Sequence, residues 1–255
     1  MGDSRTGHTH TMELIGVGVG PGDPELLTVA AVRELSSAGR VFVPAMAPGI
    51  AGRAEAVVRA HLTHDRLERL ERLVFALNDD VGGSQRRRQD CWDVAAARVV
   101  AYLRTHTGSA VFATLGDPAM YSTFGYLAQT VRGLLPGVQI RTIPGITAMQ
   151  AAATAAGLTL VEGSESLTLL PLSRDLAALD DALAGGGTVV AYKGGRHLAQ
   201  LREQVAAAGA LDRAWCAERL GTPDERITRL KETHTAAYLS TVVVLPPRNG
   251  RGAQL

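Results

Sequence analysis

The sequence has 255 residues, of which 46% are hydrophobic, 20% are charged and only 4% are aromatic. A chain of this length can form one large domain or two moderate ones, each with a buried core. Its 26 basic residues nearly balance its 25 acidic residues, and this balance argues against nucleic-acid binding, as does the scarcity of aromatic rings. No apolar stretch reaches the roughly 20 residues that a membrane-spanning helix needs.

The N-terminus and the cysteines give a second set of expectations. Residues 1–11 are polar, and we expect a flexible N-terminal extension without the apolar core of a signal peptide. Cys91 and Cys216 lie far apart, and neither stands in a CxxC or Cys/His arrangement. The sequence therefore predicts no disulfide framework, no metal site and a cytoplasmic location.

Short apolar runs and helical patterns alternate along the first part of the chain. Strands are predicted at 12–19, 40–43, 73–75, 110–114 and 138–143, and helices at 24–36, 50–60, 88–104, 121–133 and 146–156. Asp23 is the expected N-cap of the first helix, because Pro24 suits the first helical position. Such alternation favours a mainly parallel sheet covered by helices on both faces.

The pattern changes after Gly157. Strands are predicted at 167–170, 188–192, 214–218, 227–230 and 240–245, with helices at 175–183 and 197–208. Few residues join the last two strands, so we expect a mixed sheet. The sequence thus predicts two α/β domains, an N-terminal one at 12–157 and a C-terminal one at 158–255.

Three turns follow predicted strands of the first domain. They are Gly18-Val19-Gly20-Pro21-Gly22-Asp23-Pro24, Leu115-Gly116-Asp117-Pro118 and Ile143-Pro144-Gly145-Ile146-Thr147. In open α/β sheets, ligands bind beyond the carboxyl ends of the strands, and glycines let a ligand approach the backbone closely. For each turn alone, a plain strand-to-helix connection or a helix cap is the alternative.

Several other kinds of site are excluded by spacing. A G-x-G-x-x-G pattern starting at Gly16 meets Pro21 at its third glycine, and no acid follows where a dinucleotide ribose would need one. The sequence contains no Walker A loop, no GxSxG elbow and no pair of histidines at metal-ligand spacing. These absences argue against nucleotide-dependent oxidoreductases, hydrolases and metalloenzymes.

Taken together, GxGPGDPELLT near the N-terminus, GDPxxYST in the middle and PGIT before an alanine-rich helix resemble the tetrapyrrole methylase family. The resemblance runs from about Met12 to Leu245. Within the family, residues 114–123 and 162–171 look most like enzymes that methylate C20 of precorrin-2. The resemblance implies an enzyme that uses S-adenosylmethionine as its methyl donor and releases S-adenosylhomocysteine, with the donor in a cleft between the two domains. It also implies a tetrapyrrole substrate and a homodimer.

Carried over residue by residue, the resemblance assigns a donor-binding set. That set is Pro21, Leu115, Gly116, Asp117, Met120, Tyr121, Ser122, Thr123, Thr147, Ala148, Tyr192, Lys193, Arg219 and Leu220. Lys193 stands where relatives often have methionine, and Ser164 where an acidic residue is common in the subgroup. No catalytic base is assigned.

The substrate implied by the resemblance carries many carboxylates, which arginine pairs well through bidentate hydrogen bonds. The substrate-binding candidates are Asp23, Arg86, Arg88, Arg174 and Arg196. Two alternatives stay open within the family: methylation of another tetrapyrrole position, or of cobalt-factor II. An alternative of a different class is a non-catalytic ligand-binding module on the same fold.

Overall fold

The computed structural model describes residues 12–75, 85–172, 176–248 and 250, and it describes only the backbone of residues 85–87. The chain divides into two compact units, Met1–Ile146 and Thr147–Leu255. The sequence led us to expect the division at Gly157, and the observed division comes earlier in the chain. The helix between the two positions, α5 (Ala148–Ala156), packs on strand β10 of the second unit, so its apolar face belongs to that unit's core.

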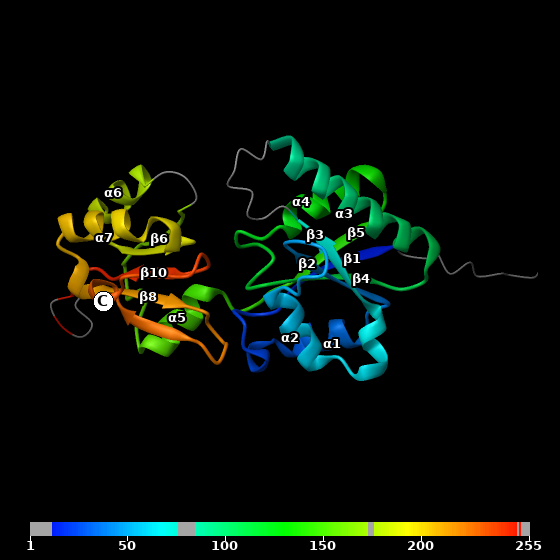
Figure 1. Cartoon of the computed structure of the whole chain (residues 1–255), viewed down its shortest axis with the longest axis horizontal. Helices are drawn as coiled ribbons and strands as arrows, with labels where there is room; N and C mark the ends of the chain where they lie inside the picture. The colour runs from blue at the N-terminus through cyan, green and yellow to red at the C-terminus, as the bar shows by residue number, and fades with distance from the viewer. Residues whose placement is uncertain (1–11, 76–84, 173–175, 249, 251–255) are drawn as a thin grey trace, which may run out of the picture. The chain divides into compact units, whose positions relative to one another are not determined.

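The first unit is built on a five-stranded sheet (Figure 1). Its strands are β1 (Glu13–Gly18), β2 (Arg40–Ala45), β3 (Leu70–Val74), β4 (Ala110–Thr114) and β5 (Gln139–Ile143). They run in the order β3-β2-β4-β1-β5, and every pairing is parallel. The expected parallel α/β arrangement is confirmed, and β1, β4 and β5 are neighbours.

Helices cover both faces of this sheet. They are α1 (Val29–Ser37), α2 (Arg53–His61), α3 (Gln85–Thr105) and α4 (Phe124–Leu134). One core cluster joins the sheet to α3 and α4, and the other joins it to α1 and α2. Figure 1 shows these two pairs of helices on opposite sides of the sheet. Because both faces are covered, β4 is buried at every position, which explains its continuous apolar sequence.

The helix predicted at 24–36 is two elements. Pro24–Leu26 forms a single 3-10 turn, η1, and α1 begins only at Val29. Asp23 caps η1 by accepting the Glu25 N–H at 2.8 Å, whereas the Thr28 hydroxyl accepts the Ala31 N–H and caps α1. Two successive caps therefore break the expected helix. The strand predicted at 73–75 also differs: β3 begins at Leu70, directly after the 3-10 helix η2 (His64–Arg69).

A buried carboxylate ties α2 to the edge strand β3. Glu55 is fully buried, and its two oxygens accept Arg72 Nε at 2.5 Å and Arg72 Nη2 at 2.7 Å. Arg59 Nε also donates to it at 2.7 Å. Hydrogen bonds from Arg72, together with those from Arg59, hold the pKa of Glu55 below its ordinary value.

The second unit contains a mixed five-stranded sheet of order β6-β7-β10-β8-β9. Its strands are β6 (Leu167–Pro171), β7 (Thr188–Tyr192), β8 (Ala214–Glu218), β9 (Arg226–Arg229) and β10 (Thr241–Val244). The sheet is mixed as expected, but not because the last two strands pair. β6 and β7 are parallel, β9 pairs with β8, and β10 lies antiparallel between β7 and β8.

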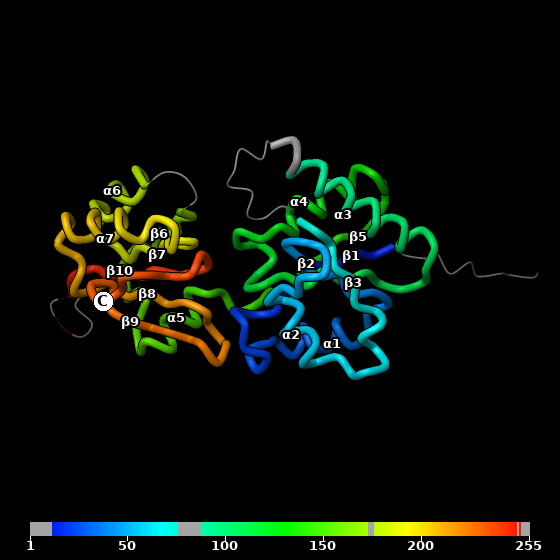
Figure 2. The backbone as a smooth tube through the Cα atoms, viewed as in Figure 1, coloured from blue at the N-terminus to red at the C-terminus, as the bar shows by residue number. Residues whose placement is uncertain are grey.

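Helices cover this second sheet on both faces as well. Besides α5, they are α6 (Ala177–Ala184), α7 (Leu198–Ala207) and the short 3-10 turns η3 (Gly194–His197), η4 (Leu211–Arg213) and η5 (Leu230–Glu232). One core cluster lies under α6 and α7, and a smaller one lies under α5. In Figure 2, the tube places α6 and α7 on the opposite side of the strands from α5.

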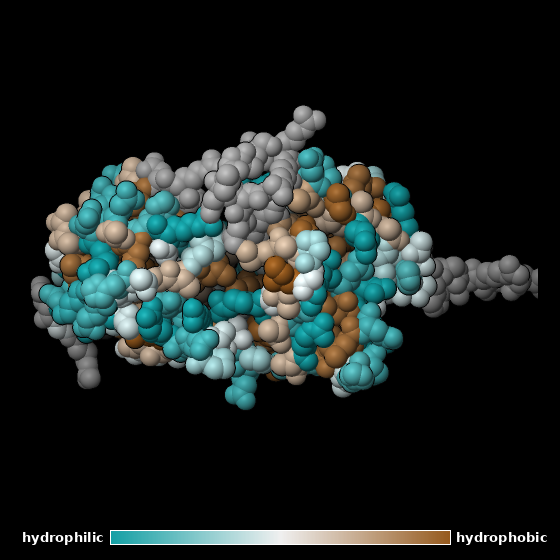
Figure 3. All heavy atoms as spheres, viewed as in Figure 1, coloured by the Kyte–Doolittle hydropathy of each residue, from teal (hydrophilic) through white to brown (hydrophobic). Residues whose placement is uncertain are grey.

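The visible surface mixes hydrophilic and apolar side chains (Figure 3). Among the described residues, we find no helix with both the length and the apolar character needed to cross a bilayer.

We predict that Glu55→Gln lowers the free energy of unfolding at pH 7 by about 3 kcal/mol, because it leaves Arg72 and Arg59 without their shared anion. The pKa of Glu55 is lowered by folding, so its contribution is complete above its unfolded pKa of about 4.3 and is lost as the pH falls through the folded pKa. Urea unfolding between pH 3 and 7 measures both effects.

The control for this prediction is Glu71→Gln. Glu71 pairs with Arg98, whose side chain is 64% exposed, and such surface pairs contribute about 0.5 kcal/mol. Equal losses in the two variants would contradict the role assigned to Glu55.

Candidate functional site

Three loops meet at the carboxyl edge of the first sheet. They follow β1, β4 and β5, which are adjacent and parallel. The Gly20 N–H donates to the Gly116 carbonyl at 3.3 Å, and the Gly116 N–H donates back to the Gly20 carbonyl at 2.7 Å. The first two turns singled out in the sequence are therefore joined directly through their backbones.

Glycines make this approach possible. A Cβ on Gly18 would lie 2.6 Å from both the Gly116 carbonyl oxygen and the Gly145 nitrogen. A Cβ on Gly145 would lie 2.2 Å from the same Gly116 oxygen. By contrast, Gly116 itself has a φ of +72°, and a Cβ there would meet nothing within 4 Å. Gly18 and Gly145 thus serve packing between loops, whereas Gly116 faces open space.

The carboxylate of Asp117 joins the second and third loops. Its Oδ1 accepts the Ala119 N–H at 2.7 Å, and its Oδ2 accepts the Gly145 N–H at 2.9 Å. Both oxygens are thus engaged by backbone groups of the protein. This arrangement suits a residue that holds the loops in register, and it does not suit a free acid or base.

The segment after Asp117 contains a strained residue. Tyr121 has a φ of +49°, a left-handed conformation that costs a non-glycine residue roughly 1 kcal/mol or more. Its side chain is 46% exposed. The next residue, Ser122, hydrogen-bonds the Thr114 hydroxyl at 2.8 Å and accepts the Phe124 N–H at 3.1 Å. Ser122 therefore anchors the turn to the sheet and leads into α4, which begins after Thr123, later than predicted.

The first loop carries a residue that the sequence analysis missed. Arg53, the first residue of α2, donates from Nη2 to the Pro21 carbonyl at 3.1 Å. Pro21 itself is buried, and burial lowers the pKa of Arg53. An arginine at the first position of a helix opposes the helix dipole, but the sequence predicted that this helix begins at residue 50, so no sequence feature identified Arg53.

In the second unit, the predicted donor residues lie at strand ends. Lys193 follows β7 with a φ of +63°, and Arg219 follows β8 with a φ of +53°. Among the described residues, these two and Tyr121 are the non-glycine residues with positive φ. Burial lowers the pKa of Lys193. All three strained positions belong to the set assigned from the sequence.

An open hollow of about 590 Å³ lies beside Arg219. The residues that line it are Glu218, Arg219, Asp224, Glu225, Arg226, Thr235, Ala236 and Ala237. Glu218 is only 5% exposed, and Arg226 donates to its Oε2 from Nη2 at 2.5 Å and from Nε at 3.2 Å. The hydrogen bonds to the Glu218 carboxylate raise the pKa of Arg226.

The remaining donor candidates have structural partners. The Thr147 N–H and hydroxyl both donate to Gln150 Oε1 at 2.9 Å, so Thr147 forms a capping box at the start of α5. Ala148 and Leu220 pack in the core cluster under α5. Leu115 packs in the first unit's core, and Met120 lies half-buried in the turn before α4.

The substrate candidates belong to both units. Asp23 is occupied as the cap of η1, and the Arg196 guanidinium lies 4.3 Å from the Tyr238 ring. Arg88 is half-buried on α3. The side chain of Arg86, and Arg174 as a whole, lie outside the described residues.

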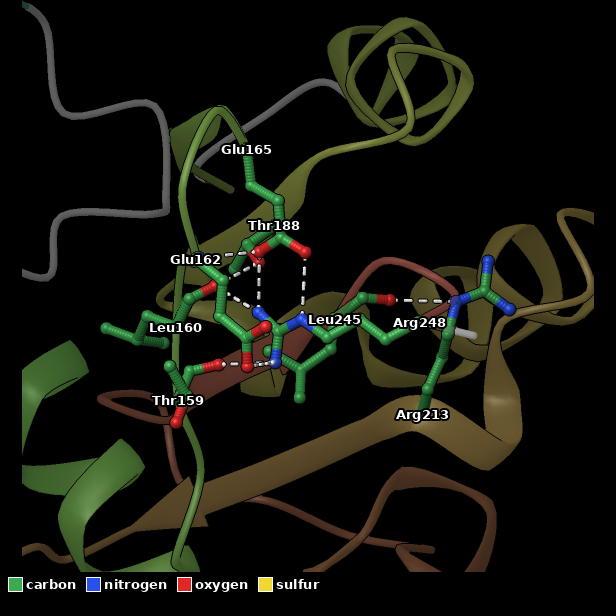
Figure 4. Close-up of polar contacts among 8 residues, drawn as sticks. All are labelled: Thr159, Leu160, Glu162, Glu165, Thr188, Arg213, Leu245 and Arg248. Atoms are coloured by element: carbon green, nitrogen blue, oxygen red, sulfur yellow. Dashed lines mark hydrogen bonds and ion pairs between the residues drawn. The ribbon is translucent and has the colours of Figure 1, made fainter. Parts of the chain in front are cut away.

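The acidic stretch 162–166, which contributed to the resemblance, is held by an arginine (Figure 4). Arg248 donates from Nε and Nη2 to the two oxygens of Glu165 at 2.8 and 2.6 Å. It also donates to the carbonyls of Thr159 and Leu160. The hydrogen bonds from Arg248 lower the pKa of Glu165. This cluster therefore anchors the loop before β6, at the edge where β7 begins.

The two cysteines differ in burial, because Cys91 is half-buried and Cys216 is fully buried. Cys216 is buried in β8, and burial together with the nearby Glu218 raises the pKa of its thiol to about 12. A thiol with this pKa stays protonated at neutral pH and is not nucleophilic.

Comparison with known proteins places this geometry among related chains. A family model described as tetrapyrrole (corrin/porphyrin) methylases matches residues 13–235. The chain is 37% identical over 235 residues to a precorrin-2 C(20)-methyltransferase of Sinorhizobium sp, covering 91% of this chain and 94% of the relative. It is 28% identical to a cobalt-precorrin-2 C(20)-methyltransferase of Salmonella typhimurium, covering 91% and 95%.

A solved structure shares the fold. It is the uroporphyrin-III C-methyltransferase of Thermus thermophilus complexed with S-adenosylhomocysteine, with a TM-score of 0.63 at 20% identity. The match covers 91% of this chain and 97% of that one.

We predict that Gly145→Ala lowers the free energy of unfolding by about 3 kcal/mol, because its Cβ would overlap backbone atoms of Gly116 and Gly18 that have little freedom to move. The matched control is Gly125→Ala in α4, where a Cβ meets nothing within 4 Å and alanine favours the helix. Thermal unfolding compares the two; an unchanged Gly145→Ala variant would refute the close contact of the loops.

Proposed function

The chain belongs to the tetrapyrrole (corrin/porphyrin) methylase family, and we propose that it transfers a methyl group from S-adenosylmethionine to C20 of precorrin-2. The observation that carries this proposal is the 37% identity, over nearly the full length of both chains, to a protein named for that reaction. The arrangement of the loops in the first unit supports it independently.

The three loops of the first unit provide the first part of the proposed donor site. They lie at the carboxyl edge of a parallel sheet, where ligands of open α/β sheets bind. Gly116 has a left-handed backbone, and the space beside its Cα is open. We assign Leu115, Gly116 and the turn Met120–Thr123 to donor contacts, and Asp117 to holding Gly145 and Ala119 around them.

The strand ends of the second unit carry further residues that we assign to the donor. Lys193 and Arg219 both adopt left-handed backbones. Such strain persists where the surrounding structure holds it, and it concentrates at binding sites. We assign the backbones of Tyr192, Lys193, Arg219 and Leu220 to the nucleoside end of the donor. Pro21, Thr147 and Ala148 complete the proposed set.

The proposed chemistry demands positioning more than acid catalysis. The donor's sulfonium supplies an activated methyl group and leaves as a neutral thioether, and C20 loses a proton after it accepts the methyl group, so no strong acid is needed. Rigid loops that bring the reacting atoms to about 3–3.5 Å in line supply much of the rate acceleration. Asp117 contributes to this rigidity through its two accepted N–H groups.

The metal content of the substrate is a second question within the same function. One observation supports the alternative of a cobalt-containing substrate: the Salmonella relative is named for cobalt-precorrin-2. The higher identity to the Sinorhizobium protein, 37% against 28%, favours the metal-free substrate.

We also propose that the protein acts as a cytoplasmic homodimer. Symmetric dimers are the commonest soluble oligomers, and α3 and α4 carry exposed apolar side chains, Val94 at 67% and Tyr126 at 51% exposure. Both cysteines are free thiols, which suits a reducing compartment.

The central test incubates the protein with S-adenosylmethionine and either precorrin-2 or its cobalt complex, and measures the product mass. We expect one added methyl group on the metal-free substrate and one equivalent of S-adenosylhomocysteine. A mass gain on the cobalt complex alone would select the alternative substrate, and no gain on either would refute C20 methylation of this intermediate.

A second prediction concerns Gly116. Gly116→Val should weaken S-adenosylhomocysteine binding by at least about tenfold, since a branched side chain would fill the open space beside the loop. Gly157→Val is the matched control, with a φ of +65° and equally open surroundings outside the proposed site. Isothermal calorimetry should find lost affinity only in the first variant, although both pay a similar cost in backbone strain.

A further inference from the structure

Residues 235–240, here called the strap, lead into β10, the central strand of the second sheet. β7 and β8 flank β10, and each is antiparallel to it. The carboxyl ends of β7 and β8 therefore lie on either side of the strap's end. Lys193 and Arg219, the two strained residues of this unit, are the first residues after those strands.

On the β8 side, one buried carboxylate holds the strap. Glu218 Oε1 accepts the Ala237 N–H at 3.1 Å, while Glu218 Oε2 accepts both donors of Arg226. Arg226 Nη2 also donates to the Thr235 carbonyl at 2.9 Å. The Glu218–Arg226 pair thus fixes the strap at two backbone positions.

On the β7 side, the strap is held by backbone and packing contacts. The Lys193 N–H donates to the Ser240 carbonyl at 2.9 Å. A Cβ on Gly195 would lie 2.1 Å from the Ala237 carbonyl oxygen, so only glycine allows this approach. Arg196 stacks over Tyr238, which gives η3 a further contact with the strap.

These contacts converge on the hollow beside Arg219. Glu218 and Ala237 both line it, and Arg219 follows Glu218 in the chain. Glu218 itself is only 5% exposed, and both of its oxygens already accept hydrogen bonds. It is therefore placed to shape the wall of the hollow and not to accept a proton from a substrate.

We propose that Glu218 is a positioning residue for methyl-donor binding: through Arg226 and the Ala237 N–H, it holds the strap and the left-handed backbone of Arg219 in the geometry that receives the donor. This proposal rests on the proposed function, because it specifies how the second unit prepares its share of the donor site. A left-handed arginine persists only where neighbouring contacts impose it. The Arg219 carbonyl accepts the N–H and the hydroxyl of Thr222 on one side, and on the other side the preceding residue, Glu218, is held by Arg226 and the Ala237 N–H.

The test is Glu218→Gln, which keeps the side-chain shape and one acceptor for Ala237 but removes the charge that engages Arg226. We expect the Kd for S-adenosylhomocysteine and the KM for S-adenosylmethionine to rise about tenfold, the size expected for one lost charge-assisted hydrogen bond. The kcat and the KM for the tetrapyrrole should stay within about twofold. Hydrogen–deuterium exchange of a peptide containing Ala237 should become faster.

The matched control is Glu165→Gln. Glu165 is another buried glutamate of this unit, with a side chain that is 4% exposed and paired with Arg248. It lies close to Thr188, where β7 begins (Figure 4). The strap enters β10 at the other end of β7, since Thr241 pairs with Tyr192. This variant should lose stability to a similar degree without changing the Kd for S-adenosylhomocysteine. If Glu218→Gln does not fold, Arg226→Lys takes its place, since it keeps the charge and loses the bidentate geometry.

The outcomes separate the two proposals. Absence of S-adenosylhomocysteine binding by the unmodified protein would overturn the proposed function, and this inference with it. Binding by the unmodified protein with an unchanged Kd in a folded Glu218→Gln variant would overturn the inference alone. Equal losses of affinity in Glu218→Gln and Glu165→Gln would also overturn it, because general destabilisation would then explain both.

Discussion

The architecture of the first unit depends on a close approach of three peptide backbones. Gly18, Gly116 and Gly145 lie so near one another that a single Cβ on Gly18 or Gly145 would overlap main-chain atoms. The parallel order β4-β1-β5 brings the three loops to one edge, and the absence of side chains lets them touch. The paired hydrogen bonds between Gly20 and Gly116 then fix their relative register. Gly18 and Gly145 approach the carbonyl oxygen of Gly116, whereas the space where a Gly116 side chain would stand stays open.

Charged side chains in both units act mainly on backbone groups. Asp117 accepts N–H groups from two loops, Arg53 donates to the Pro21 carbonyl, and Arg248 binds two carbonyls besides Glu165. In each case a charged side chain forms hydrogen bonds with peptide groups of the turns. A buried peptide group without a hydrogen bond would cost free energy. These hydrogen bonds give the loops rigidity, and a methyl transfer that relies on alignment benefits from rigid loops.

The second unit prepares its strand ends by different means. There, Lys193 and Arg219 adopt the positive φ values that glycines adopt in the first unit. The Glu218–Arg226 pair and part of the strap line the same hollow as Arg219. A non-glycine residue in this conformation is less free than glycine once folded, so it defines the backbone more narrowly. The cost is a strained residue that depends on its neighbours for support.

Much of this organisation could be predicted from the sequence, because apolar periodicity and Gly-Pro turns depend on local chemistry. Those features indicated two α/β units, the parallel first sheet, the mixed second sheet and the three loops. Local chemistry also misled: one helix was expected where Asp23 and Thr28 cap two elements, and the boundary was placed at Gly157, although α5 packs on β10. Tertiary structure alone decided which glycines pack and which one faces open space, that both Asp117 oxygens are engaged, and that Arg53, Glu218 and Arg226 matter. The reason is physical: those roles depend on contacts between residues distant in the chain, and a sequence pattern carries no record of which distant backbones meet.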